Sequence, residues 1–217
     1  DSQVKLLTII GARPQFIKAA TISRHISERD DITEFLVHTG QHYDQNMSQV
    51  FFDELYIPRP DSNLAIGSGL HGAQTGEMLT RIEEQIIDQK PDCVLVYGDT
   101  NSTLAGALAA AKLNVPICHI EAGLRSFNRT MPEEMNRILT DHASDILFAP
   151  TQVAVDRLIK EGIYENRIFR SGDVMYDAAL YYKAKANDAS VILNELNLTS
   201  GDFILATVHR AENTDDI

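Results

Sequence analysis

The sequence predicts a doubly wound α/β domain, in which helices cover both faces of a parallel β-sheet. Three observations predict it. Short runs rich in Val, Ile and Leu alternate along the chain with longer segments whose apolar residues recur at helical spacing. The short runs are almost continuously apolar, which is typical of strands buried on both faces. Each strand is followed by a helix, so successive strands are expected to be parallel.

The expected strands are short and mostly end at Gly, Pro, Asp or Glu. They cover residues 4–10, 32–39, 93–99, 116–121, 146–150 and 166–173. The expected helices cover residues 14–30, 44–56, 71–90, 100–114, 132–144 and 151–162. Pro14 and Pro132 suit the first turn of a helix. The small residues of 100–114 would let that helix pack closely on the sheet. A loop rich in Pro, Gly and Ser is expected from Ile57 to Gly69.

Two domains are expected. Residues 1–172 form the first, a Rossmann-like domain, and residues 173–217 are interpreted as the incomplete start of a second. The segment 173–197 is expected to be largely helical, and FILATVHR, at 203–210, is expected to be a strand. A lone apolar strand needs a sheet to pair with, which favours a longer two-domain protein over a naturally short one.

Composition excludes several classes of function. The chain is 44% hydrophobic and 23% charged, with a formal charge of −12. It has no basic stripe for nucleic acid. No apolar run reaches the roughly 18–20 residues that a membrane span needs, and no signal peptide is evident, so a cytoplasmic protein is expected. Cys93 and Cys118 fall in buried strands and are expected to be reduced structural thiols without metal-ligand spacing.

Polar and ionisable residues follow several of the strands. Ligands of open α/β sheets bind beyond the carboxyl ends of the strands, so these residues are expected to share one rim. The sequence contains neither a GxGxxG fingerprint nor a GxxxxGK[ST] phosphate loop, which argues against nicotinamide and P-loop chemistry. The residues that follow the strands are Arg13, Lys18, Gln41, His42, Asp99, Glu121, Arg125, His209, Arg210 and Glu212.

The first of these segments, GARPQFIK, is a candidate anion site. Gly11 allows a tight turn, and the helix that begins near Pro14 points free N–H groups at the rim. Arg13 and Lys18 could hold a diphosphate. The alternative is that Arg13 pairs with a local carboxylate and Lys18 is a solvated helix residue.

The carboxylates of the rim have competing interpretations. Asp99 could be a helix N-cap, as could Thr100. Glu121 directly follows a buried strand, so it must be paired or functional. Glu133 and Glu134 lie in a first helical turn, where negative charge is favoured, and helix stabilisation is the default for Glu134. 

Several neighbouring side chains are expected to be supporting ones. Asn136 and Arg137 could be ordinary partners of the glutamates. Arg125 and Arg129 either hold their loop or meet a substrate, and His119, inside its strand, is expected to be structural. Carboxylates facing a basic anion site suggest acid–base chemistry on a phosphorylated or nucleotide-linked substrate.

Six motifs, in order, resemble one known family. They are GARPQFIK, GQHYD, YGDTNSTLAGALAA, HIEAGLRS, MPEEMNR and ATVHRAEN, spread over essentially the whole chain. They resemble the non-hydrolysing UDP-N-acetylglucosamine 2-epimerases, especially the branch that acts on UDP-2,3-diacetamido-2,3-dideoxy-glucuronate. Gln15 departs from the glutamate usual in the commoner enzymes. GQHYD lacks the further glutamine of members that UDP-N-acetylglucosamine regulates, so allosteric control is not expected.

The resemblance implies a two-domain fold similar to GT-B glycosyltransferases, no metal, no cofactor and a homodimer. It implies inversion at C2 of a UDP-linked 2-acetamido sugar, through elimination and re-addition of UDP, for polysaccharide precursor synthesis. Asp99, Glu121, Glu133 and His209 are the implied catalytic residues. The implied residues around the substrate and UDP are Arg13, Lys18, Gln41, His42, Arg210, Glu212 and Asn213.

Three alternatives stay open. One is a hydrolysing relative that releases UDP and free sugar. Another is a retaining glycosyltransferase, which the acid-rich rim disfavours. The third is that these 217 residues alone are an inactive nucleotide-sugar-binding fragment.

Overall fold

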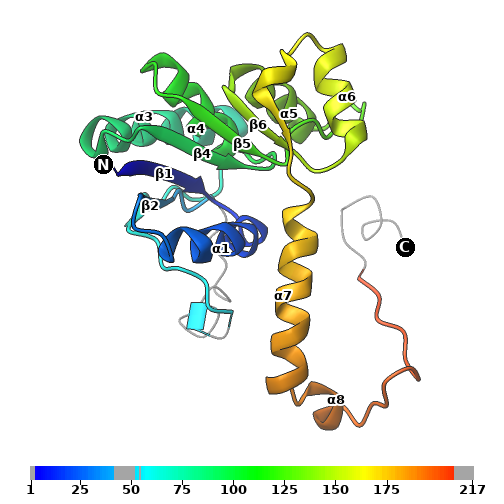
Figure 1. Ribbon diagram of the computed structural model, residues 1–217. Helices are drawn as coiled ribbons and strands as arrows, with labels where there is room; N and C mark the ends of the chain where they lie inside the picture. Colours follow the sequence, from blue (N-terminus) through cyan, green and yellow to red (C-terminus); the bar gives the residue numbers. More distant parts are fainter. Residues whose placement is uncertain (1–2, 42–51, 54, 208–217) are drawn as a thin grey trace. The chain divides into compact units, whose positions relative to one another are not determined.

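A seven-stranded parallel sheet forms the centre of the protein (Figure 1). A computed structural model describes residues 3–41, 52–53 and 55–207 of the chain. The strand order is β3-β2-β1-β4-β5-β6-β7, and every neighbouring pair is parallel. The strands are β1 (Val4–Ile10), β2 (Ile32–His38), β3 (Ser62–Asn63), β4 (Cys93–Tyr97), β5 (Ile117–Ile120), β6 (Ile146–Ala149) and β7 (Ile168–Arg170). The predicted fold class is confirmed, and β3 is an addition within the expected loop.

Helices cover both faces of this sheet. The helices of this part of the chain are α1 (Arg13–Ser27), α3 (His71–Gln89), α4 (Asn101–Lys112), α5 (Pro132–Ala143) and α6 (Gln152–Lys160), and α7 (Val174–Ala189) and α8 (Ile192–Glu195) follow β7 along the chain. Helix α1 lies on one face, and α3 and α4 lie on the other (Figure 1). The helix expected at 44–56 lies largely outside the described residues. No described helix is long and apolar enough to span a membrane.

The two faces of the sheet have separate apolar cores. Ile10 and Phe16 are fully buried in the core under α1. Ile9, the neighbour of Ile10 in β1, points to the other face and packs with Met78 and Ile82 of α3. Successive side chains of a strand alternate between faces, so a strand buried on both sides must be continuously apolar. This is why the apolar runs predicted strands rather than surface helices.

Helix α4 lies very close to the sheet. A Cβ atom on Gly106 would lie 3.1 Å from Val96 Cγ1 and 3.2 Å from Ile9 Cγ1, so even an alanine there would force its neighbours to shift. Ala105 and Ala109 are fully buried beside it. The close packing expected from the small residues of this helix is confirmed.

The sheet changes winding direction between β1 and β4. The chain runs from β1 through α1 to β2 on one side, and from β4 through α4 to β5 on the other. In sheets of this kind, the ligand-binding crevice lies beyond the carboxyl ends of the strands, between the loops that leave the two strands at the switch point, which here are β1 and β4. We call the residues that follow β1, β2, β4 and β5 at this edge, namely 11–15, 39–41, 98–103 and 121–127, the rim.

The chain divides into two compact units, Asp1–Ala179 and Leu180–Ile217. The helical segment expected at 173–197 is confirmed by α7 and α8. The strand expected at 203–210 is wrong for its described part, because 203–207 has no regular structure. Ile204 and Leu205 are 95% and 85% exposed, and a strand without a hydrogen-bonded neighbour is not stable. The domain boundary expected after residue 172 stays a prediction.

Candidate active site

Lys18, Gly98 and Glu121 meet at the rim, although they come from three separate segments. Lys18 Nζ on α1 donates to Glu121 Oε2, which follows β5, at 2.6 Å. A Cβ atom on Gly98, after β4, would lie 3.3 Å from Glu121 Oε2 and 3.7 Å from Lys18 Nζ. The two charged side chains are 16% and 11% exposed, so they are partly open to a ligand. The predicted convergence of these strand ends is thus found in the structure.

Glu121 has an unusual backbone conformation. Its φ of +70° is in the left-handed region, which residues other than glycine rarely adopt. Gly98 and Gly123 on either side of this turn also have positive φ, +67° and +80°. Ala122 N donates to the carbonyl of Phe148 in β6 at 3.0 Å, which anchors the turn to the sheet. Such a conformation costs about 1–3 kcal/mol and persists only where surrounding contacts hold it.

Gln15 joins the turns after β1 and β4. Its Oε1 accepts from the backbone N–H groups of Gly11 (2.7 Å) and Ala12 (3.1 Å). Its Nε2 donates to the carbonyl of Tyr97 at 2.8 Å and to the hydroxyls of Thr100 and Thr103. Both ends of the amide are used, so Gln15 positions the two loops that form the crevice. Sequence reasoning noted its departure from glutamate but not this role.

The turn after β2 is tied to α4 in a similar way. Gln41 Oε1 accepts from Ser102 N at 3.0 Å and from Ser102 Oγ at 2.6 Å. Gly11 is required here, because a Cβ atom would lie 2.1 Å from Ser102 Oγ and 2.4 Å from Thr39 Oγ1. Gln41 is only 6% exposed. Its expected contact with the substrate stays a prediction.

Thr100, not Asp99, caps helix α4. Its hydroxyl accepts from Thr103 N, which settles the competition between the two candidate caps. Asp99 is instead paired with α5: Arg137 NH2 donates to Asp99 Oδ2 at 2.6 Å, and Asn136 Nδ2 donates to its carbonyl at 2.9 Å. The Asp99 side chain is 32% exposed. Its carboxylate is therefore oriented by α5 and still accessible from the rim.

Glu134 is the buried member of the glutamate pair. It is 1% exposed and accepts hydrogen bonds from Ser126 N and Oγ, Phe127 N and Arg137 NH1 at 2.8–3.0 Å. Burial acts to raise the pKa of Glu134, but these donors outweigh it and lower that pKa to about 2. Glu134 thus holds the loop between β5 and α5, a role beyond the expected helix stabilisation. The expected pairing of Arg137 with a glutamate is confirmed.

The remaining predicted residues are only partly placed. Glu133 is exposed in the first turn of α5, and Arg13 is exposed at the first residue of α1. The roles predicted for both residues stay predictions. Five predicted site residues lie outside the described part of the chain, namely His42, His209, Arg210, Glu212 and Asn213.

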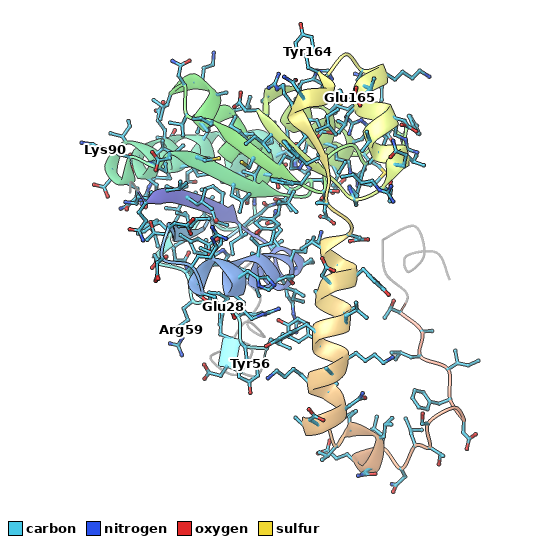
Figure 2. All side chains as sticks on the ribbon, viewed as in Figure 1. Glu28, Tyr56, Arg59, Lys90, Tyr164 and Glu165 are labelled. Atoms are coloured by element: carbon cyan, nitrogen blue, oxygen red, sulfur yellow. The ribbon has the colours of Figure 1, made fainter. Side chains whose placement is uncertain are left out.

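A separate hollow lies away from these residues. It has a volume of about 750 Å³ and is lined by residues of α1 and β2 and by Tyr56 and Arg59. Figure 2 labels Tyr56 and Arg59. None of the predicted catalytic residues lines it. The rim has ion pairs of accessible side chains and a strained turn, whereas the hollow has none of the predicted catalytic residues. We therefore place the candidate active site at the rim.

These features define a class of protein. A doubly wound parallel sheet with ionisable side chains at its switch point is a Rossmann-like domain that binds its ligand beyond the strand ends. The chain belongs to the UDP-N-acetylglucosamine 2-epimerase family, because residues 24–217 match the family model of that description.

Individual relatives agree with this assignment. The chain is 60% identical to the UDP-2,3-diacetamido-2,3-dideoxy-D-glucuronate 2-epimerase of Pseudomonas aeruginosa, over 98% of this chain and 59% of that protein. It is 49% identical to a UDP-N-acetylglucosamine 2-epimerase of Methanocaldococcus jannaschii, over 98% of this chain and 58% of that protein. The structure of the M. jannaschii enzyme with UDP-N-acetylglucosamine and UDP matches with a TM-score of 0.90 and 49% identity, over 98% of this chain and 59% of that chain. The chain therefore spans less than two thirds of the length of these relatives.

Proposed function

We propose that the full-length protein containing this chain is a non-hydrolysing epimerase that inverts C2 of a UDP-linked 2-acetamido sugar. The observation that carries the proposal is the Lys18–Glu121 ion pair of 2.6 Å, next to the Asp99 turn, at the switch point of this family's fold. This pair supports the proposal, because a carboxylate and an ammonium group lie together at the edge where such sheets bind their ligands. The names of the relatives support the same activity.

The proposed reaction needs a base and a stabilised leaving group. A carboxylate takes the proton from C2, the C2–H electron pair forms the C1=C2 double bond, and the C1–O bond breaks with its pair going to UDP. UDP then adds back to C1 while a carboxylic acid returns a proton to C2 on the opposite face. No oxidant is required, because substrate and product are isomers. The C2 proton is only weakly acidic, so positioning and electrostatic stabilisation must lower the barrier.

The chain's own residues divide these tasks. Asp99, Glu121 and Glu133 are the proposed acid–base residues. Arg13, Lys18 and protonated His209 are proposed to offset the charge that develops on departing UDP. The segment with Arg210, Glu212 and Asn213, together with Gln41 and His42, is proposed to position the nucleotide. Family resemblance supports each of these assignments, and the geometry supports those of Asp99, Lys18 and Glu121 most directly.

The proposed substrate is the UDP-2,3-diacetamido-glucuronate, with UDP-N-acetylglucosamine as the alternative. The resemblance of the motifs to the diacetamido-glucuronate branch supports this order, whereas the identities do not rank the two substrates, because a UDP-N-acetylglucosamine 2-epimerase homolog of Methanococcus maripaludis is 60% identical, as is the P. aeruginosa enzyme. A GT-B-like two-domain architecture, a homodimer, a cytoplasmic location and a role in polysaccharide precursor synthesis are proposed on family resemblance.

One experiment tests the function and the substrate together. The full-length protein is given each of the two UDP-sugars in D₂O, and the products are analysed by NMR and mass spectrometry. We expect C2 epimerisation of the diacetamido-glucuronate, one deuterium at C2 and no accumulation of free UDP. Full retention of hydrogen at C2 would contradict the mechanism, and stoichiometric free UDP would indicate the hydrolysing relative. The 217-residue chain assayed in parallel tests whether this part alone is active.

A further inference from the structure

Asp141 is a buried carboxylate behind the rim that contacts one of its loops and strand β5. It lies on α5 and is 1% exposed. Its Oδ2 accepts from Gly123 N at 3.0 Å and from Arg125 NH1 at 2.7 Å. Its Oδ1 lies 2.6 Å from His119 Nδ1. One side chain thus binds the loop that follows Glu121 and the strand that precedes it.

His119 extends this contact to the neighbouring loop. It is fully buried in β5, as expected of a structural histidine, and its Nε2 lies 2.8 Å from the carbonyl of Gly98. A carbonyl oxygen can only accept, so Nε2 must carry a proton. The other ring nitrogen of His119, Nδ1, is the atom that lies 2.6 Å from Asp141 Oδ1. His119 therefore links α5 to the turn that carries Asp99.

The carboxylate of Asp141 lies between two nitrogen-bearing side chains, those of His119 and Arg125. Burial acts to raise the pKa of Asp141, but His119 and Arg125 outweigh it and hold that pKa below its usual range. Arg125, whose side chain is 1% exposed, also binds Glu161 at 2.7 Å. Arg125 thus holds its loop and does not reach the open crevice, which answers the choice that the sequence left open. Because these buried ions are paired and hydrogen-bonded, their attraction offsets the desolvation penalty of burial, and removal of one partner would leave an uncompensated buried charge.

The two anchored glycines flank the strained turn at Glu121. Gly98 N donates to the carbonyl of Ile120 at 3.0 Å, and Gly98 O is held by His119. Gly123 N is held by Asp141 on the other side of Glu121. The left-handed φ of Glu121 is therefore maintained by contacts on both sides.

We propose that Asp141 is a positioning residue that fixes, through Gly123 and His119, the backbone from which Glu121 and Asp99 project. The proposal rests on the proposed epimerase function, because it assigns a catalytic consequence to that placement. Asp141 acts through other residues and does not itself meet the substrate.

The test compares Asp141→Asn with Asp145→Asn in the full-length protein. Asp145 also accepts a backbone N–H of β5, from Ile117 at 2.9 Å, but at the opposite end of the strand and with a 53% exposed side chain. In Asp141→Asn, an amide N–H₂ replaces one acceptor oxygen and the negative charge that pairs with Arg125 is lost, so the contacts with Gly123, Arg125 and His119 cannot all be kept as they are. We expect kcat to fall roughly 10²-fold with KM little changed, as for a misplacement of about 1 Å. Asp145→Asn should keep wild-type kcat.

Hydrogen exchange gives a second readout that does not depend on activity. Peptides covering residues 118–126 should exchange faster in Asp141→Asn than in wild type, while in Asp145→Asn they should not. Wild-type kcat in folded Asp141→Asn would overturn the proposal, as would unchanged exchange. If Asp141→Asn does not fold, His119→Gln replaces it and the same outcomes decide.

The two proposals fail in different ways. A wild-type protein that does not epimerise either UDP-sugar refutes the proposed function. The exchange measurement then still decides whether Asp141 holds the Glu121 loop. Normal wild-type epimerisation with an unaffected Asp141→Asn variant refutes the positioning role alone.

Discussion

The two ends of the rim are held by different kinds of interaction. Beside β1, the loops are fixed by the neutral amides of Gln15 and Gln41, which bind backbone groups and hydroxyls. Beside β5, they are fixed by the ionised side chains of Glu134 and Asp141, which bind arginines and backbone N–H groups. Hydrogen bonds of neutral amides thus fix the loops beside β1, which we call the neutral wall. Buried ion pairs fix the loops beside β5, which we call the ionic wall.

This difference separates structural charges from charges that can react. Glu134 and Asp141 are each 1% exposed and satisfied by several donors, so their charges are used to hold the loops. Asp99 and Glu121 are 32% and 11% exposed at the side chain and pair with Arg137 and Lys18. Their carboxylates are therefore more accessible than those of Glu134 and Asp141.

The largest effect is expected at the partly exposed carboxylate. Glu121→Gln removes the proposed base while keeping its shape, so kcat should fall about 10²–10⁴-fold, the usual contribution of a general base. The rate of deuterium entry at C2 measures it. Glu84→Gln, on the exposed face of α3, is the matched control and should keep wild-type turnover. Near-normal turnover by folded Glu121→Gln would remove this residue from the mechanism.

The neutral wall can be tested with two substitutions at one position. Gln15→Leu leaves the buried N–H groups of Gly11 and Ala12 without an acceptor, and each such loss costs about 1–3 kcal/mol. Gln15→Glu keeps that acceptor and loses the amide donor to Tyr97, Thr100 and Thr103, of which the two threonine hydroxyls can turn to donate to the new carboxylate. The free energy of unfolding, measured with urea, should therefore fall more for Gln15→Leu than for Gln15→Glu. The reverse order would show that the amide donor is the more important half.

The ionic wall predicts a dependence of stability on pH. The folded-state pKa of Glu134 is about 2, below its ordinary value of 4.5, so its contribution is present above pH 4.5 and is lost as the pH falls towards 2. The shift corresponds to at most about 3 kcal/mol. Urea unfolding of Glu134→Gln should show a flatter pH dependence across this window than wild type. Glu133→Gln, the exposed neighbour, should keep the wild-type dependence, and equal curves for all three proteins would contradict the prediction.

The fold was predictable because its signals are local. Continuous apolar runs identified the strands of the large sheet, and the order of strands and helices identified its parallel character. The placement of Asp99 and Glu121 at the rim followed from their positions directly after strands. The short strand β3 was missed because two residues, Ser62 and Asn63, carry no periodic pattern.

Helix α5 shows why parts of the site were not predictable. Its buried residues are polar, namely Glu134, Asn136, Thr140 and Asp141, while Leu139 is 44% exposed. The pattern of apolar residues predicts a helix here. The same pattern would also predict that the polar face of this helix is exposed to solvent, whereas in the structure that face is buried. The partners of Asp141 lie 16–22 residues earlier in the chain, so its burial depends on contacts that no local pattern reveals. A usable signal was the spacing of Glu134 and Asp141, seven residues apart on one helical face.

Gly106 makes the rim sensitive to substitutions in the interior of the protein. It lies five residues after Asn101, about 7.5 Å along α4, with no room for a methyl group between the helix and the sheet. A larger residue there would push the helix outward and carry Asn101, Ser102 and Thr103 with it. A random mutagenesis screen for altered turnover should therefore recover substitutions at Gly106, together with compensating reductions in size at Val96 or Ile9. Such pairs would adjust the width of the crevice without changing any residue that lines it.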